Sequence, residues 1–158
     1  MTVEPSTVKG FELASAADVL AGRSPVSVEV RGWVARKHTV GGLVFVQVRD
    51  GSGYVQVSAR KGASDSAFEG ARSSTKESAV VVRGEVRDDK RAPGGKEIAA
   101  KEFVVVAPAE SWPITKTAAK SGSFLFDKRH LSIRGPKAIA AMRIRAEVVG
   151  AAFDPDLH

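Results

Sequence analysis

Between residues 26 and 60 the chain alternates apolar and polar side chains with a period of two. Valine recurs at alternate positions in VSVEVRGWVARKH, residues 26–38, and again in the two segments that flank Gly51 and Ser52. Successive side chains of a β-strand point to opposite faces, so the pattern predicts one strand followed by a hairpin of two. Gly32 interrupts the first strand, and a glycine there favours a bulge or a sharp coil.

The register of the hairpin follows from its short turn. If Asp50 pairs with Gly53, odd residues of the first hairpin strand oppose even residues of the second. One face then consists of Val44, Val46, Val48, Val55, Val57 and Ala59. The opposite face consists of Phe45, Gln47, Arg49, Tyr54, Gln56 and Ser58. A phenylalanine among amides and an arginine needs a reason other than core packing.

The segments on either side of the hairpin predict two short helices and two further strands. Residues 62–78 are small and polar, but Ala67, Phe68 and Ala71 recur at helical spacing, which predicts a short helix with Ser64 as its N-cap. Apolar alternation predicts strands at 79–89 and 96–107, on either side of a Pro-Gly-Gly reversal. Before the first strand, Ser15 is placed to cap another short helix.

Three strands, a short helix and two strands follow each other in the order of the OB-fold, an all-β five-stranded Greek-key barrel. We therefore expect an N-terminal leader at 1–24 and the barrel at 25–108. Residues 109–158 are expected to form a hinge and a helix that begins at Pro136. The helix shows an apolar stripe of Ile139, Met142, Ala146, Val149 and Phe153.

Charge and residue usage narrow the class of function. The 158 residues have a formal net charge of +6, which is compatible with a polyanionic partner such as nucleic acid. The absence of cysteine excludes disulfides and thiolate metal sites, and three scattered histidines predict no metal site. Neither a membrane-spanning run nor a signal peptide is evident, so we expect a cytoplasmic protein without a membrane partner. Hydrolase, Walker, zinc-protease and dinucleotide motifs are missing, so we predict no catalytic residues.

The polar face of the hairpin predicts a nucleotide-binding site. An aromatic ring such as Phe45 can stack on a base, and Gln56 lies diagonally across the hairpin, where its amide can reach the edge of that base. The alternative for Phe45 is packing beneath a loop or the leader.

Charged residues near the hairpin extend this prediction. Arg36, Lys37 and Arg49 can neutralise phosphates. Glu97, which follows the Pro-Gly-Gly turn, can accept from a base amine or imino group. The alternative for Glu97 is a solvated charge at the edge of the sheet. Three cations around the same turn can attract phosphate or be plain surface charge: Lys90, Arg91 and Lys96.

Several of these stretches match a known family. VEVRGWVARKHTVGGLVFVQVRDGSGYVQV resembles the N-terminal anticodon-binding domain of class IIb aminoacyl-tRNA synthetases. VRGEVRDDKRAPGGKEI and WPITKTAAKSGSFLFDKRHLSIRGPKAIAAMRIRAEV are similar to asparaginyl-tRNA synthetases within that class. The likeness covers roughly residues 10–152 and is specific as a set of motifs.

The resemblance implies roles for individual residues. Phe45 matches the aromatic residue that stacks on the central anticodon base, a uridine, and Gln56 matches the glutamine that reads the same base. Glu97 matches an acidic residue that helps to read the third base. Arg36, with Lys37 beside it, matches a basic residue after the Gly-Trp-Val motif.

The resemblance also implies what the chain lacks. By the resemblance, residues 109–158 would contain the hinge and the start of the family's catalytic domain. The rest of that domain, which binds ATP and Mg²⁺ and ligates asparagine to tRNA, is missing, so we expect no catalysis and no cofactor in this chain. The expected partner is a tRNA anticodon loop. The C-terminal helix is expected to pair with a second copy or a synthetase subunit. Two alternatives stay open: a general single-stranded nucleic-acid-binding OB module, and an interaction module related to the aspartyl-type synthetases.

Overall fold

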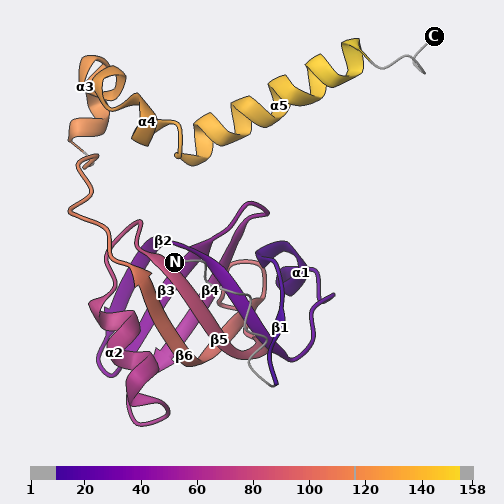
Figure 1. Cartoon of the computed structure of the whole chain (residues 1–158), viewed down its shortest axis with the longest axis vertical. Coiled ribbons are helices and arrows are strands. Elements are labelled where there is room, and N and C mark those ends of the chain that lie inside the picture. The colour runs from indigo at the N-terminus through magenta and orange to yellow at the C-terminus, as the bar shows by residue number, and fades with distance from the viewer. Residues whose placement is uncertain (1–9, 116, 154–158) are drawn as a thin grey trace. The chain divides into compact units, whose positions relative to one another are not determined.

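The computed structural model describes residues 10–115 and 117–153 (Figure 1). The chain divides into two units, one ending at Ser111 and the other beginning at Trp112. Each unit is described by itself below.

The first unit is a closed five-stranded barrel, as the element order predicts (Figure 1). Its strands are β2 (Ser27–Val40), β3 (Leu43–Arg49), β4 (Tyr54–Arg60), β5 (Ala79–Asp88) and β6 (Lys96–Ala107). β2 pairs with both β3 and β5, and β6 pairs with both β5 and β4, so the pairings form a ring without a free edge. The predicted helix is α2 (Asp65–Ser73), capped by Ser64, between β4 and β5.

Two further elements precede the barrel. α1 (Ala16–Leu20) is capped by Ser15, as predicted, and its Ala16 and Val19 are buried in the core. The short strand β1 (Glu12–Leu13) was not predicted and pairs in parallel with β2. A two-residue strand has too few positions to show an alternation.

The hairpin has the predicted register. Asp50 donates its backbone N–H to the Gly53 carbonyl at 3.0 Å, and Phe45 lies opposite Ser58. The alternating apolar residues all point into the barrel, where each has at most 1% of its surface exposed: Val44, Val46, Val48, Val55, Val57 and Ala59. Burial of this one face stabilises the register, since a slip of one residue would expose all of these side chains.

β2 contains a bulge, but Gly32 is not its site. Gly32 pairs regularly with Val80, while the register with β3 shifts between Val34 and Arg36 and leaves Ala35 as the extra residue. Gly32 instead allows β2 and β3 to approach each other closely. A Cβ atom at position 32 would lie 2.3 Å from the carbonyl oxygen of Arg49 on β3.

The bulge at Ala35 reverses which side chains of β2 face outward. Val34 before the bulge opposes the inward-facing Val48. After the bulge Lys37 opposes the inward-facing Val46, and Arg36 opposes the outward-facing Gln47. A regular strand would have exchanged the positions of these two cations.

The chain leaves the barrel through an anchored segment. Ala109 donates its backbone N–H to the Ser78 hydroxyl at 3.1 Å, and its carbonyl accepts from the Thr75 hydroxyl at 2.8 Å. The two hydroxyls lie 2.8 Å apart in the turn that leads from α2 to β5. The exit of the barrel is therefore fixed two residues beyond the end of β6.

The second unit is helical, and none of its described residues is buried. It contains η1 (Ala118–Lys120), α3 (Gly122–Asp127), α4 (Arg129–Ser132) and α5 (Pro136–Ala152), and α5 begins at Pro136 as predicted. The predicted apolar stripe does not account for all the apolar residues of α5. Ile144 and Val148, 66% and 64% exposed, lie on the opposite side of the helix at 100° per residue. No helix in the described part of the chain has the length and hydropathy needed to cross a bilayer.

Replacing Gly32 tests the close crossing of β2 and β3. We expect Gly32→Ala to lower the free energy of unfolding by about 1–3 kcal/mol, because its Cβ would overlap a backbone carbonyl that cannot move without disturbing the ladder. Urea unfolding measures the change. Gly51→Ala is the matched control, since a Cβ there meets no atom within 4 Å; equal losses for both variants would contradict the crossing argument.

A pH titration tests the carboxylate that holds α1 to the hairpin turn. Asp50 accepts from the backbone N–H of Ala16 at 2.7 Å, of Ser52 at 2.7 Å and of Gly53 at 2.9 Å. Burial raises the pKa of Asp50, but hydrogen bonds from Ser52, Ala16 and Gly53 outweigh burial and bring the pKa below its ordinary value of 3.8. A lowered pKa means that the stabilisation is complete above pH 3.8 and is lost as the pH falls below that value.

Asp50→Asn should therefore be less stable than the wild type at pH 7, by about 1–3 kcal/mol. Its further loss of stability between pH 5 and pH 2 should be smaller than that of the wild type. Chemical unfolding across this range measures both quantities. Asp88→Asn serves as the control, because the Asp88 side chain is 85% exposed. Parallel pH profiles for Asp50→Asn and the wild type would refute the assignment.

Candidate nucleic-acid interface

The outer face of the barrel has two adjacent rows of side chains, which the strand registers bring together. Opposed residues in paired strands lie on the same face, so each row runs across four strands. The first row consists of Arg36 on β2, Gln47 on β3, Gln56 on β4 and Glu97 on β6. The second row consists of His38, Phe45, Ser58 and Ala99 on the same four strands. We call these eight residues the two-row surface.

Phe45 lies on this outer face and outside the hydrophobic core. Its ring is partly exposed and borders a pocket of about 320 Å³. Ser58 lies directly opposite Phe45, and Gln56 lies diagonally from it, as predicted. The sequence therefore predicts the face on which the ring lies and its neighbours within the hairpin.

Glu97 joins the two rows through hydrogen bonds. One carboxylate oxygen accepts from the Gln56 amide nitrogen at 3.2 Å, and the other accepts from the Ser58 hydroxyl at 3.0 Å. All three side chains are partly buried. Glu97 is thus a fixed member of the surface and not a solvated charge at the edge of the sheet.

Arg36 is the basic residue of the two-row surface. The bulge at Ala35 turns its exposed side chain outward, opposite Gln47. Within the described ranges, its guanidinium has no hydrogen bond or ion pair with the protein. Arg36 is therefore placed to meet a phosphate near Phe45.

Two other predicted phosphate ligands are engaged within the fold. Arg49 pairs with Glu77 through contacts of 2.8 and 3.2 Å, and their side chains are only 12% and 6% exposed. The ammonium of Lys37 donates to the backbone carbonyls of Arg72 and Ser74, at the C-terminal end of α2. Both cations compensate acceptors within the fold: Arg49 pairs with a buried carboxylate, and Lys37 with carbonyls at a helix end. A phosphate contact by either residue would have to compete with these bonds.

Four cations line the pocket beside Phe45, and sequence reasoning singled out only one of them, Arg91. The lining contains Arg60, Arg87, Arg91 and Lys101, together with the acids Asp89 and Glu97. Arg91 bonds Asp89 through its backbone and side chain, which lowers the pKa of Asp89. Lys101 and Arg87 both bond Glu85, and the hydrogen bond from Lys101 is the main cause of the lowered pKa of Glu85. The positive charge at the pocket is therefore partly compensated.

The pocket's cations come from different strands and loops, and only the barrel closure brings them together. Strand alternation within the hairpin predicts that Gln47 and Ser58 share the face of Phe45, although neither is among the predicted site residues. His38 could not have been aligned with Phe45 without knowledge of the bulge in β2.

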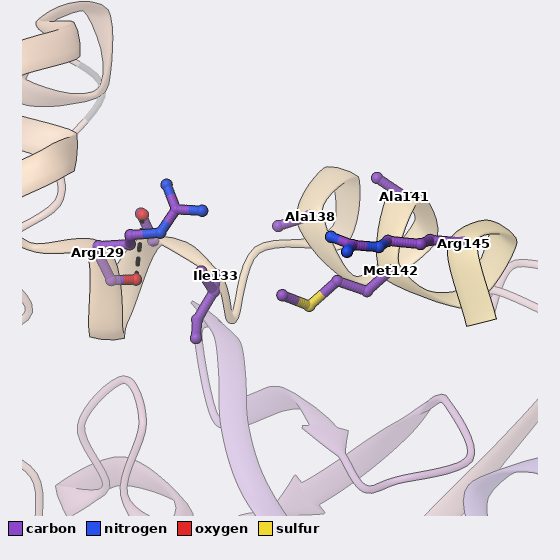
Figure 2. Close-up of a pocket in the computed structure, with 7 residues that line it drawn as sticks. Arg129, Ile133, Ala138, Ala141, Met142 and Arg145 are labelled. Atoms are coloured by element: carbon purple, nitrogen blue, oxygen red, sulfur yellow. Dashed lines mark hydrogen bonds between the residues drawn. The ribbon is translucent and has the colours of Figure 1, made fainter. Parts of the chain in front are cut away.

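The second unit has a pocket of about 320 Å³ between α4 and α5, shown in Figure 2. Apolar side chains such as Ile133 and Met142 line it with Arg129 and Arg145. Ser132 donates its hydroxyl to the Arg129 carbonyl at 3.2 Å. The lining contains no acid or base pair suited to catalysis. Across the described part of the chain, no three His, Cys, Asp or Glu residues form a metal-binding group.

Comparisons with known proteins agree with this geometry. A tRNA anticodon family model, described as an OB-fold nucleic acid binding domain, matches residues 28–106. The asparagine–tRNA ligase of Thermococcus kodakarensis is 39% identical over 136 residues, which are 86% of this chain and 31% of that protein. The asparagine–tRNA ligase of Chloroflexus aurantiacus is 42% identical over 126 residues, which are 79% of this chain and 28% of that protein.

A solved structure extends the likeness to three dimensions. The asparaginyl-tRNA synthetase from Pyrococcus horikoshii, complexed with asparaginyl-adenylate, superposes with a TM-score of 0.80 at 34% identity, over 89% of this chain and 33% of that chain. The chain thus spans about a third of the length of the relatives it matches. It belongs to the tRNA anticodon family of OB-fold nucleic acid binding domains, and its relatives there include the asparagine–tRNA ligases.

Proposed function

We propose that the barrel binds the anticodon loop of a tRNA, and that it prefers an asparagine anticodon. The observation that supports this most directly is the two-row surface, in which an aromatic ring, an amide and a carboxylate adjoin one another on the outer face of a nucleic-acid-binding domain. Single-stranded bases are recognised by the same combination of stacking on a ring and hydrogen bonding to the base edge.

Each side chain has a distinct task in this proposal. Phe45 stacks on the central anticodon base, a uridine, and the Gln56 amide hydrogen-bonds to the edge of that base. Glu97 assists at the third base. Arg36 neutralises a backbone phosphate, since it is exposed and lies in the same row as Gln56.

Arg49 and Lys37 have a smaller share in RNA binding than Arg36. Their charges are already satisfied by Glu77 and by the end of α2. Their main contribution is to hold the hairpin and β2 in the positions that orient the two-row surface.

The relatives called asparagine–tRNA ligases suggest the wider setting. We propose that this chain supplies tRNA binding to asparagine–tRNA ligation in the cytoplasm, and that ATP and Mg²⁺ act in a catalytic domain of which residues 109–158 hold only the hinge and the start. The exposed apolar side chains of α5, such as Ile144 and Val148, are then covered by a second copy or by a synthetase subunit.

A general single-strand binder is the second candidate, and the four cations beside Phe45 favour it. Such a protein would respond to salt more than to base identity. The two candidates therefore differ in the sequence dependence of their affinity.

Removing the ring tests stacking. Phe45→Ala should weaken binding of an asparagine anticodon stem-loop by about 1–3 kcal/mol, because the ring provides the stacking surface. Fluorescence anisotropy measures the dissociation constant. Tyr54→Ala is the matched control, since Tyr54 lies on the same hairpin face but opposite Arg49, at the other end of β3. Equal affinities of Phe45→Ala and the wild type would refute the stacking role.

Changing the central base separates the two candidate functions. Replacing the central uridine of the stem-loop by cytidine should weaken binding to the wild type by about 1–3 kcal/mol, as a lost pattern of hydrogen bonds does. Binding is measured at two salt concentrations with stem-loops of equal length. A general binder would give the same affinity for both loops at each salt concentration, and that result would favour the second candidate.

A further inference from the structure

The Gln56 side chain is held in one orientation of its amide. Its terminal group lies 3.2 Å from one oxygen of Glu97. A carboxylate only accepts hydrogen bonds, so the atom of Gln56 that faces it must be the nitrogen and not the oxygen. The orientation thus follows from the chemistry of the neighbour and does not depend on telling nitrogen from oxygen.

Glu97 is itself held in place. Its second oxygen accepts from the Ser58 hydroxyl at 3.0 Å, so a different side chain occupies each oxygen. Ser58 lies directly opposite Phe45, while Glu97 is the register partner of Gln56. The three residues therefore link the second row, which contains Phe45, to the first row, which contains Gln56.

This network exists because the barrel closes where β4 meets β6. The two strands pair in parallel over only three positions, from Gln56 with Glu97 to Ser58 with Ala99. A carboxylate placed at the first pair can reach the side chains at both ends of this short ladder. The contact with Ser58 prevents Glu97 from turning away into solvent.

A fixed amide presents its donor and acceptor in a fixed order. Uridine offers an N3–H donor at the centre of its pairing edge, whereas cytidine has an N3 acceptor there and an amine beside it. The two bases therefore present opposite hydrogen-bonding patterns to a glutamine. A glutamine that rotates freely can exchange its oxygen and nitrogen and satisfy either base, but a glutamine held by Glu97 cannot.

We propose that Glu97 is a positioning residue that selects uridine over cytidine through the orientation of Gln56, with Ser58 as its anchor. The inference rests on the proposed function, because it concerns how Gln56 reads the central base. It assigns Glu97 a task at that base in addition to the third. Rejection of cytidine then results from the protein's own network and not from a direct contact of Glu97 with the central base.

Glu97→Gln tests this role, because a glutamine at position 97 can accept or donate and so permits either orientation of Gln56. Affinities are measured for stem-loops that differ only at the central base. We expect the ratio of uridine to cytidine affinity to fall by about five- to tenfold. Most of the change should be tighter binding of the cytidine loop. Ser58→Ala should change the ratio in the same direction by a smaller factor.

Glu69→Gln is the charge-matched control, since Glu69 lies on α2 and pairs with the exposed Arg72. It removes one negative charge and should leave the ratio unchanged. A Glu97→Gln ratio equal to that of the wild type, with altered discrimination only at the third base, would overturn the positioning role and leave the proposed function intact. Equal affinity of the wild type for both loops would instead refute the proposed function.

A measurement without RNA tests the network independently. In NMR spectra, the side-chain amide signals of Gln56 should shift in Glu97→Gln and in Ser58→Ala, and should stay in place in Glu69→Gln. The spectra also report whether each variant folds. Unchanged Gln56 signals in both folded variants would overturn the inference, whatever the result with RNA.

Discussion

The fold depends on one strand serving two neighbours. β2 pairs with β5 through its first half and with β3 through its second, and these two pairings close the ring between β5 and β3. The close approach of β2 to β3 leaves no room for a side chain at Gly32, and the bulge at Ala35 follows three residues later. Closure thus determines which residues of β2 face outward, and with them the composition of the two-row surface.

The closure of the barrel also brings together the polar side chains of the two-row surface. Arg36, Gln47, Gln56 and Glu97 come from four strands, and they meet because the ring aligns them. The hydrogen bond between Gln56 and Glu97 in this row is partly shielded from water, which strengthens it relative to an exposed pair. The three cations predicted to meet phosphate therefore divide between two tasks: Arg36 stays open to a ligand, whereas Arg49 and Lys37 hold the scaffold.

Local patterns in the sequence were enough to predict which hairpin residues share a face, but not which residues of the other strands join them on the two-row surface. Alternation and a two-residue turn determine which face Phe45 and Gln56 share, because both act over a few residues. The hydrogen bond between Gln56 and Glu97 spans 41 residues and depends on the short parallel pairing of β4 with β6. The burial of Arg49 could not be predicted, because its partner Glu77 lies in an irregular turn where it adopts a φ of 70°, a conformation unusual for a residue other than glycine.

The anchoring of Ala109 has a mechanical consequence. Tension applied through the residues that follow would act first on the hydrogen bonds to Thr75 and Ser78, and only afterwards on the ladder of β6. Each such hydrogen bond contributes roughly 1 kcal/mol, so the two bonds together are weaker than the ladder of β6 and break before it. These two hydrogen bonds lie at the turn preceding β5, whereas Phe45 and Ser58 lie on β3 and β4. A load applied beyond Ala109 would therefore break these two hydrogen bonds before it distorted the two-row surface.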